Sequence, residues 1–182
     1  LTQVDAWTVF HNSPVNVPHY RLKVDVFMYW DTTSVTGTTE FGHVGVGGDG
    51  ATFNSVFTPI SGSGAFIAFT GDGGSASDFR WFRSSVNTPP GETDSTTLPN
   101  SHPSYLGHGS NGTGAFYQSL FPSPPSTFAG SPGNIWTTVE IRAVGPKMTA
   151  RLNGTRTAET SDAKYARGPV ALQAAGGLVR SR

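Results

Sequence analysis

The chain has no cysteine among its 182 residues. This absence excludes structural disulfides, metal sites built on thiolates and catalysis by a cysteine nucleophile. Charge is also scarce: Lys, Arg, Asp and Glu together make up 13% of the chain, and 12 basic residues balance 12 acidic ones. Because there is neither a basic surplus nor a basic cluster, the sequence argues against a nucleic-acid partner.

Long helical patterns and long apolar runs are missing as well. No apolar run approaches the roughly 18 residues that a transmembrane helix needs, so no transmembrane segment is predicted. The chain is instead rich in glycine (23 residues), proline (13 residues) and aromatics (12%). This composition favours strands and turns over helices. We therefore expect one all-β domain that covers residues 1–182.

Alternation of apolar and polar residues predicts the strands. Residues 20–30 and 136–143 both alternate over a long stretch, which is typical of a strand with one buried face. Asn153-Gly154 is the preferred dipeptide of a two-residue hairpin turn, so residues 148–152 and 155–160 are expected to pair. Further strands are predicted at residues 40–47, 65–70, 78–83 and 170–173.

Residues 84–134 differ from the rest of the chain. Pro, Gly, Ser, Thr and Asn dominate there, and only residues 114–120 resemble a strand. Strands of one style flank this stretch, so we interpret it as a loop-rich excursion of the domain and not as a linker. Strands separated by turns, with no helices between them, predict a two-sheet antiparallel jelly-roll sandwich.

Two segments carry a family resemblance. Residues 136–159 (WTTVEIRAVGPKMTARLNGTRTAE) and 168–177 (GPVALQAAGG) resemble the closing strands of concanavalin A-like jelly rolls, above all those of the 3-keto-disaccharide hydrolase family. Residues 69–74 (FTGDGG) and 78–80 (DFR) are similar to laminin-G-like (LamG) domains of secreted bacterial proteins. The resemblance implies a concanavalin A-like fold, a secreted or cell-surface location and an oligo- or polysaccharide partner.

The motifs of common hydrolases are absent. Jelly-roll glycosidases of the retaining kind carry E-x-D-x-x-E on one strand, which holds two carboxylates roughly 5 Å apart. The sequence has neither this triad nor a G-x-S-x-G nucleophile elbow. We therefore expect a lectin-like carbohydrate-binding domain without catalysis. One alternative, which the resemblance implies, is a hydrolase or lyase acting on (3-keto-)glycosides. Its candidate catalytic residues would be Glu140, Arg142, His43 and Asp78.

A third alternative is a structural subunit of an extracellular assembly. It would be held together through residues 84–134 and through strand edges. A further strand is expected after the last predicted one, and its absence would leave an unpaired edge that could pair with a neighbouring chain, so self-association through strand edges is expected under this alternative.

Aromatic residues on strands provide the candidate ligand-binding site. Trp and Tyr rings offer flat apolar surfaces to the C–H faces of sugars, while charged neighbours bind hydroxyl groups. Trp136 shares a strand face with Glu140 and Arg142, and Trp81 shares one with Arg83. The alternative is that each tryptophan closes the end of the core and that His43 is a plain surface residue. The predicted ligand-binding residues are Tyr29, Trp30, His43, Trp81, Arg83, Trp136, Glu140 and Arg142.

Calcium is the metal that this architecture would take, since it prefers carboxylate and carbonyl oxygens from turns. Asp49 in GGDG and Asp72 in TGDGG are the candidate ligands. The alternative is that Asp-Gly simply makes a good turn. No other cofactor is expected.

Overall fold

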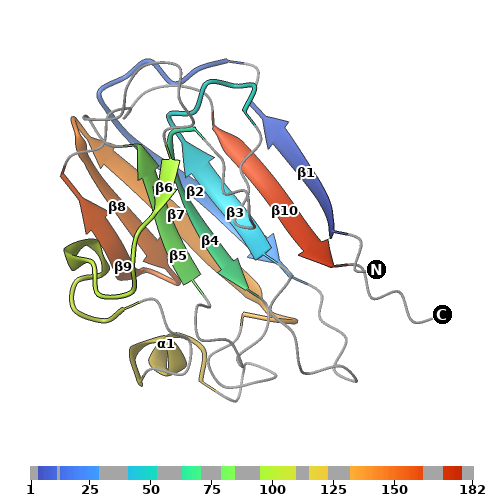
Figure 1. Ribbon diagram of the computed structural model, residues 1–182, viewed down its shortest axis with the longest axis vertical. Coiled ribbons are helices and arrows are strands. Elements are labelled where there is room, and N and C mark those ends of the chain that lie inside the picture. Colours follow the sequence, from blue (N-terminus) through green and yellow to red (C-terminus); the bar gives the residue numbers. More distant parts are fainter. Residues whose placement is uncertain are drawn as a thin grey trace.

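Two antiparallel β-sheets pack face to face (Figure 1). This computed structural model describes residues 4–11, 13–28, 41–52, 63–70, 79–84, 95–109, 115–122, 132–161 and 170–177. The six-stranded sheet has the order β1 (Val4–Phe10), β10 (Ala171–Gly177), β3 (Phe41–Val46), β4 (Ala65–Thr70), β5 (Phe79–Ser84) and β6 (Ser95–Thr97). The four-stranded sheet has the order β2 (His19–Phe27), β7 (Trp136–Val144), β8 (Lys147–Leu152) and β9 (Thr155–Thr160). The predicted all-β sandwich is confirmed.

The predicted meander at residues 136–160 is confirmed strand by strand. Buried and accessible residues alternate along β7 and β8, as the sequence pattern indicated. Asn153 and Gly154 join β8 to β9 with φ angles of 48° and 81°, as a tight hairpin turn requires. The Asn153 side chain also accepts a hydrogen bond from the Thr138 backbone N–H at 3.0 Å, which ties the turn to β7.

The core lies between the two sheets. Strands β2, β3, β4, β5, β7 and β8 contribute every second side chain to it, because successive residues of a strand point to opposite faces. The buried core side chains with the largest volumes include Trp81, Phe69, Phe79 and Ile67 from the six-stranded sheet and Ile141, Met148 and Leu152 from the four-stranded sheet.

The last described strand is not an edge. β10 is longer than the predicted residues 170–173, and it pairs with β3 on one side and with β1 on the other. The sequence analysis did not predict β1. Among the described residues, the edge strands are therefore β1 and β6 in one sheet and β2 and β9 in the other, and self-association through strand edges stays a prediction.

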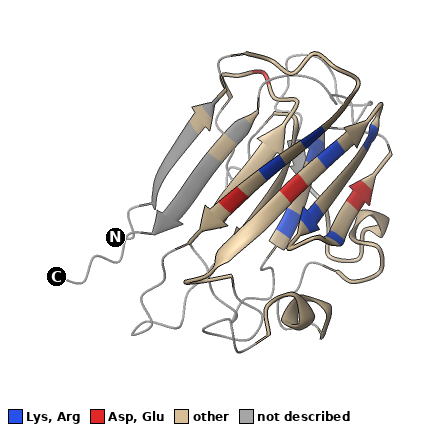
Figure 2. Cartoon of the chain, turned by 180° about the vertical axis from the view of Figure 1, so that it is seen from behind, with Lys and Arg blue, Asp and Glu red and all other residues tan. Residues whose placement is uncertain are grey.

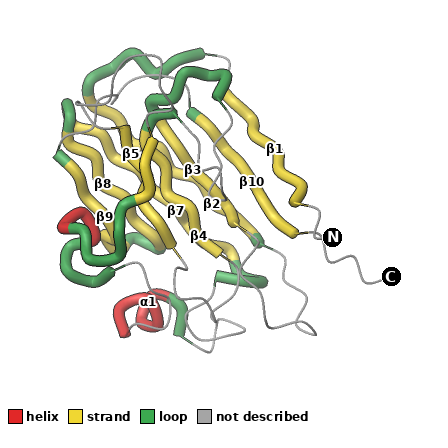
Figure 3. The backbone as a smooth tube through the Cα atoms, in the orientation of Figure 1, coloured by secondary structure: helices red, strands yellow, loops and turns green. Residues whose placement is uncertain are grey.

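The strand predicted at residues 114–120 is wrong. Ala115–Leu120 form a short helix, α1, which lies beyond the ends of the strands (Figure 3). Tyr117 and Phe121 are spaced by one helical turn, and both side chains are fully buried in the core. A 3-10 turn at Pro103–Tyr105 and the short strand β6 are two further elements that the sequence analysis assigned to loops.

Candidate functional site

The structure does not bring the predicted site residues together. Trp136, Glu140 and Arg142 lie on the outer face of the four-stranded sheet, whereas His43 lies on the outer face of the six-stranded sheet. Both sheets separate these two groups, and sheets of a sandwich are stacked about 10 Å apart. Glu140 and His43 therefore cannot act on the same substrate group.

Trp81 is a core residue. Its side chain is 0% exposed and belongs to the cluster between the sheets, where no ligand can stack on the indole without unfolding the domain. Arg83 follows two positions later on the same side of β5 and is half-buried. The core alternative thus holds for Trp81. The sequence could not decide this point, because β5 carries Phe79 and Trp81 on one face and Phe82 on the other.

Four predicted residues lie outside the described part of the chain: Tyr29, Trp30, Asp72 and Asp78.

Asp49 is described, and its hydrogen bonds hold the turn that follows β3. Its carboxylate accepts hydrogen bonds from the backbone N–H groups of Ala51 and Thr52, from the Thr52 hydroxyl and from the Ser63 hydroxyl at 3.0 Å. Partial burial alone would raise the pKa of Asp49, but these hydrogen bonds outweigh burial and lower the pKa to about 2. In the described residues, no three His, Asp or Glu side chains gather as metal ligands would. Calcium binding stays a prediction.

An exposed pair of aromatic rings marks one end of the outer face of the four-stranded sheet. Phe27 on β2 and Trp136 on β7 are partners in the antiparallel register. Their ring centroids lie 5.4 Å apart with the planes tilted by 54°. Phe27 is 45% exposed and Trp136 is 70% exposed. Large exposed aromatic surfaces of this kind mark contact sites for a ligand or a partner.

Polar and charged side chains continue from this aromatic pair along β2 and β7 (Figure 2). Asp25 accepts a hydrogen bond from the Thr138 hydroxyl at 2.6 Å. Glu140 follows, opposite Lys23 and 3.7 Å from the Arg151 guanidinium. The face therefore offers a flat apolar surface with hydrogen-bonding groups directly beside it.

The outer face of the six-stranded sheet carries an aromatic row, which we define as Phe41, His43, Phe66 and Phe82. Phe66 stacks on Phe82 with centroids 4.4 Å apart and on the His43 imidazole with centroids 5.6 Å apart. All four side chains are buried, with exposed fractions of 7% or less.

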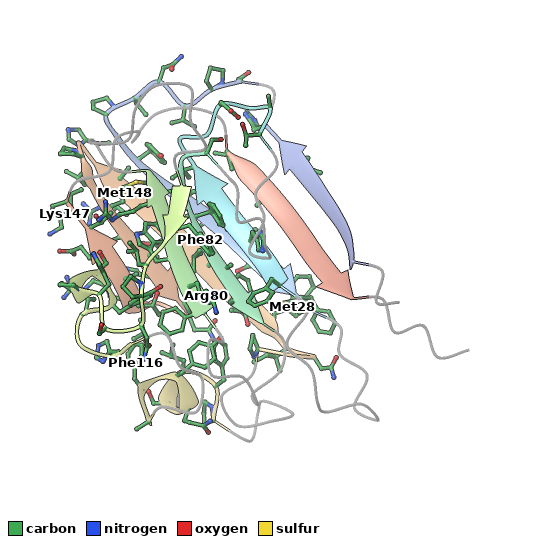
Figure 4. The ribbon with its side chains drawn as sticks, viewed as in Figure 1. Met28, Arg80, Phe82, Phe116, Lys147 and Met148 are labelled. Atoms are coloured by element: carbon green, nitrogen blue, oxygen red, sulfur yellow. The ribbon has the colours of Figure 1, made fainter. Side chains whose placement is uncertain are left out.

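The position of Gly45 explains the close packing of this row. A Cβ atom at Gly45 would lie 2.8 Å from the Phe66 Cβ, so a side chain there would push Phe66 away from β3. Figure 4 labels Phe82 and Arg80, which both belong to β5 and alternate with the core residues Phe79 and Trp81. Arg80 is thus placed on the same outer face as the row.

Sequence reasoning missed the partners of both candidate sites. Phe27 was not among the predicted site residues, because it belongs to a site only through its position opposite Trp136. The two residues are 109 positions apart in the chain (27 and 136), and the alternation within one strand does not show which strand pairs with it. Phe41, Phe66 and Phe82 could have been grouped with His43. Once Val44, Val46 and Ile67 are assigned to the core, alternation places these phenylalanines on the opposite face.

The fold is that of the two-sheet β-sandwiches, a class that includes carbohydrate-binding modules. One solved structure of this class, the carbohydrate-binding module CBM66 from Bacillus subtilis, aligns with a TM-score of 0.52 and 8% identity, over 94% of this chain and 77% of that chain. The chain belongs to the family of 3-keto-alpha-glucoside-1,2-lyase-like domains, whose model matches residues 62–182. No curated protein matches the sequence. No helix among the described residues is long and apolar enough to cross a membrane.

Proposed function

We propose that the protein is a secreted or cell-surface carbohydrate-binding domain, and that the ligand stacks on Phe27 and Trp136. The observation that carries this proposal is the exposure of the aromatic pair: 45% of Phe27 and 70% of Trp136 on a rigid sheet face. The fold shared with a carbohydrate-binding module and the lyase-like family both support a sugar ligand.

The geometry suggests how a sugar would bind. The rings of Phe27 and Trp136 are tilted by 54°, so together they offer a shallow apolar surface to the C–H face of a pyranose or furanose ring. Asp25 and Thr138 occupy the next pair of positions on the same face. Oδ1 of Asp25 is already engaged by Thr138, which leaves Oδ2 to accept a hydrogen bond from a sugar hydroxyl.

Calorimetric titration against a panel of soluble oligo- and polysaccharides tests this proposal. For any glycan that binds, Trp136→Ala should weaken binding at least about tenfold, or about 1.4 kcal/mol. Val144→Ala is the matched control, because Val144 is also exposed on the outer face of β7 but at the opposite end. If Trp136→Ala binds a glycan as tightly as Val144→Ala does, the proposed site is incorrect.

A second candidate function is cleavage of a glycoside. It is favoured by His43, an ionisable side chain that is only 3% exposed and stacks on Phe66 within an otherwise apolar row. Burying an imidazole in such a layer is costly, and buried ionisable groups are concentrated at catalytic sites. The family of lyase-like domains supports this candidate as well.

Product analysis after incubation with 3-keto-glycosides and their parent glycosides tests the enzyme candidate. If the wild-type protein cleaves one of them, His43→Asn should abolish turnover, whereas Glu140→Gln, on the opposite sheet, should retain it. Turnover that survives in His43→Asn would remove this residue from the mechanism, and turnover lost in Glu140→Gln would place the reaction on the other face.

A further inference from the structure

Three cations lie side by side on the outer face of the four-stranded sheet. Arg21 and Lys23 belong to β2 and Arg142 belongs to β7, and Arg21 and Arg142 are direct partners in the register. All three side chains are exposed. Among the described residues, no carboxylate lies within 4.0 Å of their charged nitrogens.

The other three cations of this face each contact a carboxylate, and two of them share one. Lys147 and Arg156 both pair with Glu159, at 2.8 Å and 3.0 Å, and Arg151 lies 3.7 Å from Glu140. Glu140 and Glu159 thus pair with cations, whereas Asp25 is hydrogen-bonded through Oδ1 to the neutral Thr138 hydroxyl. Arg21, Lys23 and Arg142 are therefore the cations of this face that have no carboxylate within 4.0 Å among the described residues, although Glu140 lies opposite Lys23 in the register. Figure 2 shows basic and acidic positions side by side on this sheet.

The opposed pair Arg21 and Arg142 lowers the stability of the ligand-free protein. Like charges directly opposite each other on adjacent strands destabilise a sheet. An exposed glutamate at position 21 or 142 would remove the repulsion and add a cross-strand ion pair. Two opposed arginines present paired planar forks, which match the geometry of an anionic group such as a carboxylate.

The cations and the aromatic pair lie on the same face of the same two strands, with Asp25 and Glu140 between the two ends. Arg21 and Arg142 lie six residues from Phe27 and Trp136 along the same two strands, about 20 Å at about 3.3 Å per residue. A ligand that contacts both ends is extended and stacks on the aromatic rings, and negative charge on it would complement Arg21 and Arg142. Resting on the proposed carbohydrate function, we propose that the ligand is an acidic polysaccharide with uronate carboxylates, and that Arg21 and Arg142 bind one of these carboxylates.

Comparison of charged and neutral polysaccharides tests this inference. Calorimetric titrations with polygalacturonate, alginate, dextran sulfate, dextran and laminarin would be made with wild-type protein, Trp136→Ala, and the double variant Arg21→Gln with Arg142→Gln. The double variant should bind a uronate polymer roughly 10- to 100-fold more weakly, with a thermal midpoint equal to or above that of the wild type, because a repulsion is removed. Arg156→Gln is the control, since Arg156 is exposed but paired with Glu159.

Ionic strength provides a second readout. Raising sodium chloride from about 50 mM to about 500 mM should weaken uronate binding by the wild type and have little effect on the residual binding of the double variant, because salt screens exposed charges.

The outcomes separate this inference from the proposed function. If dextran or laminarin binds as tightly as polygalacturonate and only Trp136→Ala weakens binding, the inference is overturned and the proposed function stands. Binding of dextran sulfate, without binding of polygalacturonate or alginate, would overturn the choice of a carboxylate. If none of the glycans binds, or if Trp136→Ala changes nothing, the proposed function itself fails.

Discussion

Phe27 and Trp136 stand opposite each other on β2 and β7, with ring centroids 5.4 Å apart and both rings open to solvent. The inner faces of the same two strands pack against the core through Val24, Val139 and Ile141. Core packing of these inner side chains therefore holds the two strands in place, and the rings of Phe27 and Trp136 remain exposed. The proposed binding surface is thus separate from the residues that form the core.

Substitution of Trp81 should lower the stability of the protein much more than substitution of Trp136. Trp81→Ala leaves a large cavity in the core and should lower the free energy of unfolding by about 3–5 kcal/mol. Trp136→Ala removes a ring that is 70% exposed and should cost less than about 1 kcal/mol. Urea unfolding followed by far-ultraviolet circular dichroism measures both. Equal losses of stability would contradict the assignment of Trp81 to the core and Trp136 to the surface.

The hydroxyl of Tyr105 stabilises the edge of the six-stranded sheet. It accepts a hydrogen bond from the Trp81 backbone N–H at 2.9 Å and donates one to the Leu98 carbonyl at 3.4 Å. Tyr105→Phe leaves that buried N–H without its acceptor and should cost about 1–3 kcal/mol. Tyr20→Phe is the control, because the buried Tyr20 hydroxyl makes no hydrogen bond within the described residues, and its loss should be almost neutral.

Tyr105 also predicts a dependence on alkaline pH. Burial raises the pKa of Tyr105 to about 12 from 10.0, even though the Trp81 hydrogen bond and the charge of Arg80 act in the opposite direction. The folded state thus favours the neutral phenol. Its contribution is complete below about pH 10 and is lost as the pH rises towards about 12. Over this pH range, the free energy of unfolding of Tyr105→Phe should fall less than that of the wild type. An equal fall in both proteins would contradict the prediction.

Asp49 predicts a dependence on acidic pH. The folded-state pKa of about 2 lies below the ordinary value of 3.8, so the carboxylate stabilises the fold at higher pH and this contribution disappears as the pH falls through about 2. Since the turn is partly solvated, Asp49→Ala should cost only about 1 kcal/mol near neutral pH. The difference from the wild type should vanish near pH 2. A thermal midpoint raised by calcium in the wild type, but not in Asp49→Ala, would instead establish the calcium site.

Gly45 should not tolerate a side chain. The Cβ of alanine would meet the Phe66 Cβ at 2.8 Å, and an atom so close to the backbone cannot rotate away. Gly45→Ala should therefore destabilise the protein by about 1–3 kcal/mol through overpacking. Gly154→Ala is not a suitable control, because the φ of 81° at Gly154 strains any side chain. Ala68→Gly, which belongs to the same buried cluster as Phe66, tests the opposite change in volume. A neutral Gly45→Ala would contradict the packing of the aromatic row.

The fold was predictable where local signals agree. Residues 136–160 combine strict alternation with Asn153-Gly154, and the structure has the predicted strands and turn. The helix α1 was missed because its six residues are too few for a clear period. The spacing of Tyr117 and Phe121 by four residues was the available signal. β6 has three residues, and its formation depends on pairing with β5 and not on its own sequence.

The site was predictable only in part. The shared face of Trp136, Glu140 and Arg142 follows from alternation within one strand, and the structure has it. The position of His43 relative to these residues depends on which strands form which sheet, and that information comes from long-range pairing. For the same reason the opposed pair Arg21 and Arg142 became visible only with the register of β2 and β7.

The most direct test of the account is to follow the indole N–H signals of the four tryptophans by nitrogen-15 nuclear magnetic resonance during titration with a glycan that binds. Trp136→Phe and Trp81→Phe assign two of the signals. The account predicts that the Trp136 signal shifts in a saturable manner while the signal of the buried Trp81 stays in place. A titration in which the Trp136 signal does not move, although the glycan binds, would contradict the proposed surface.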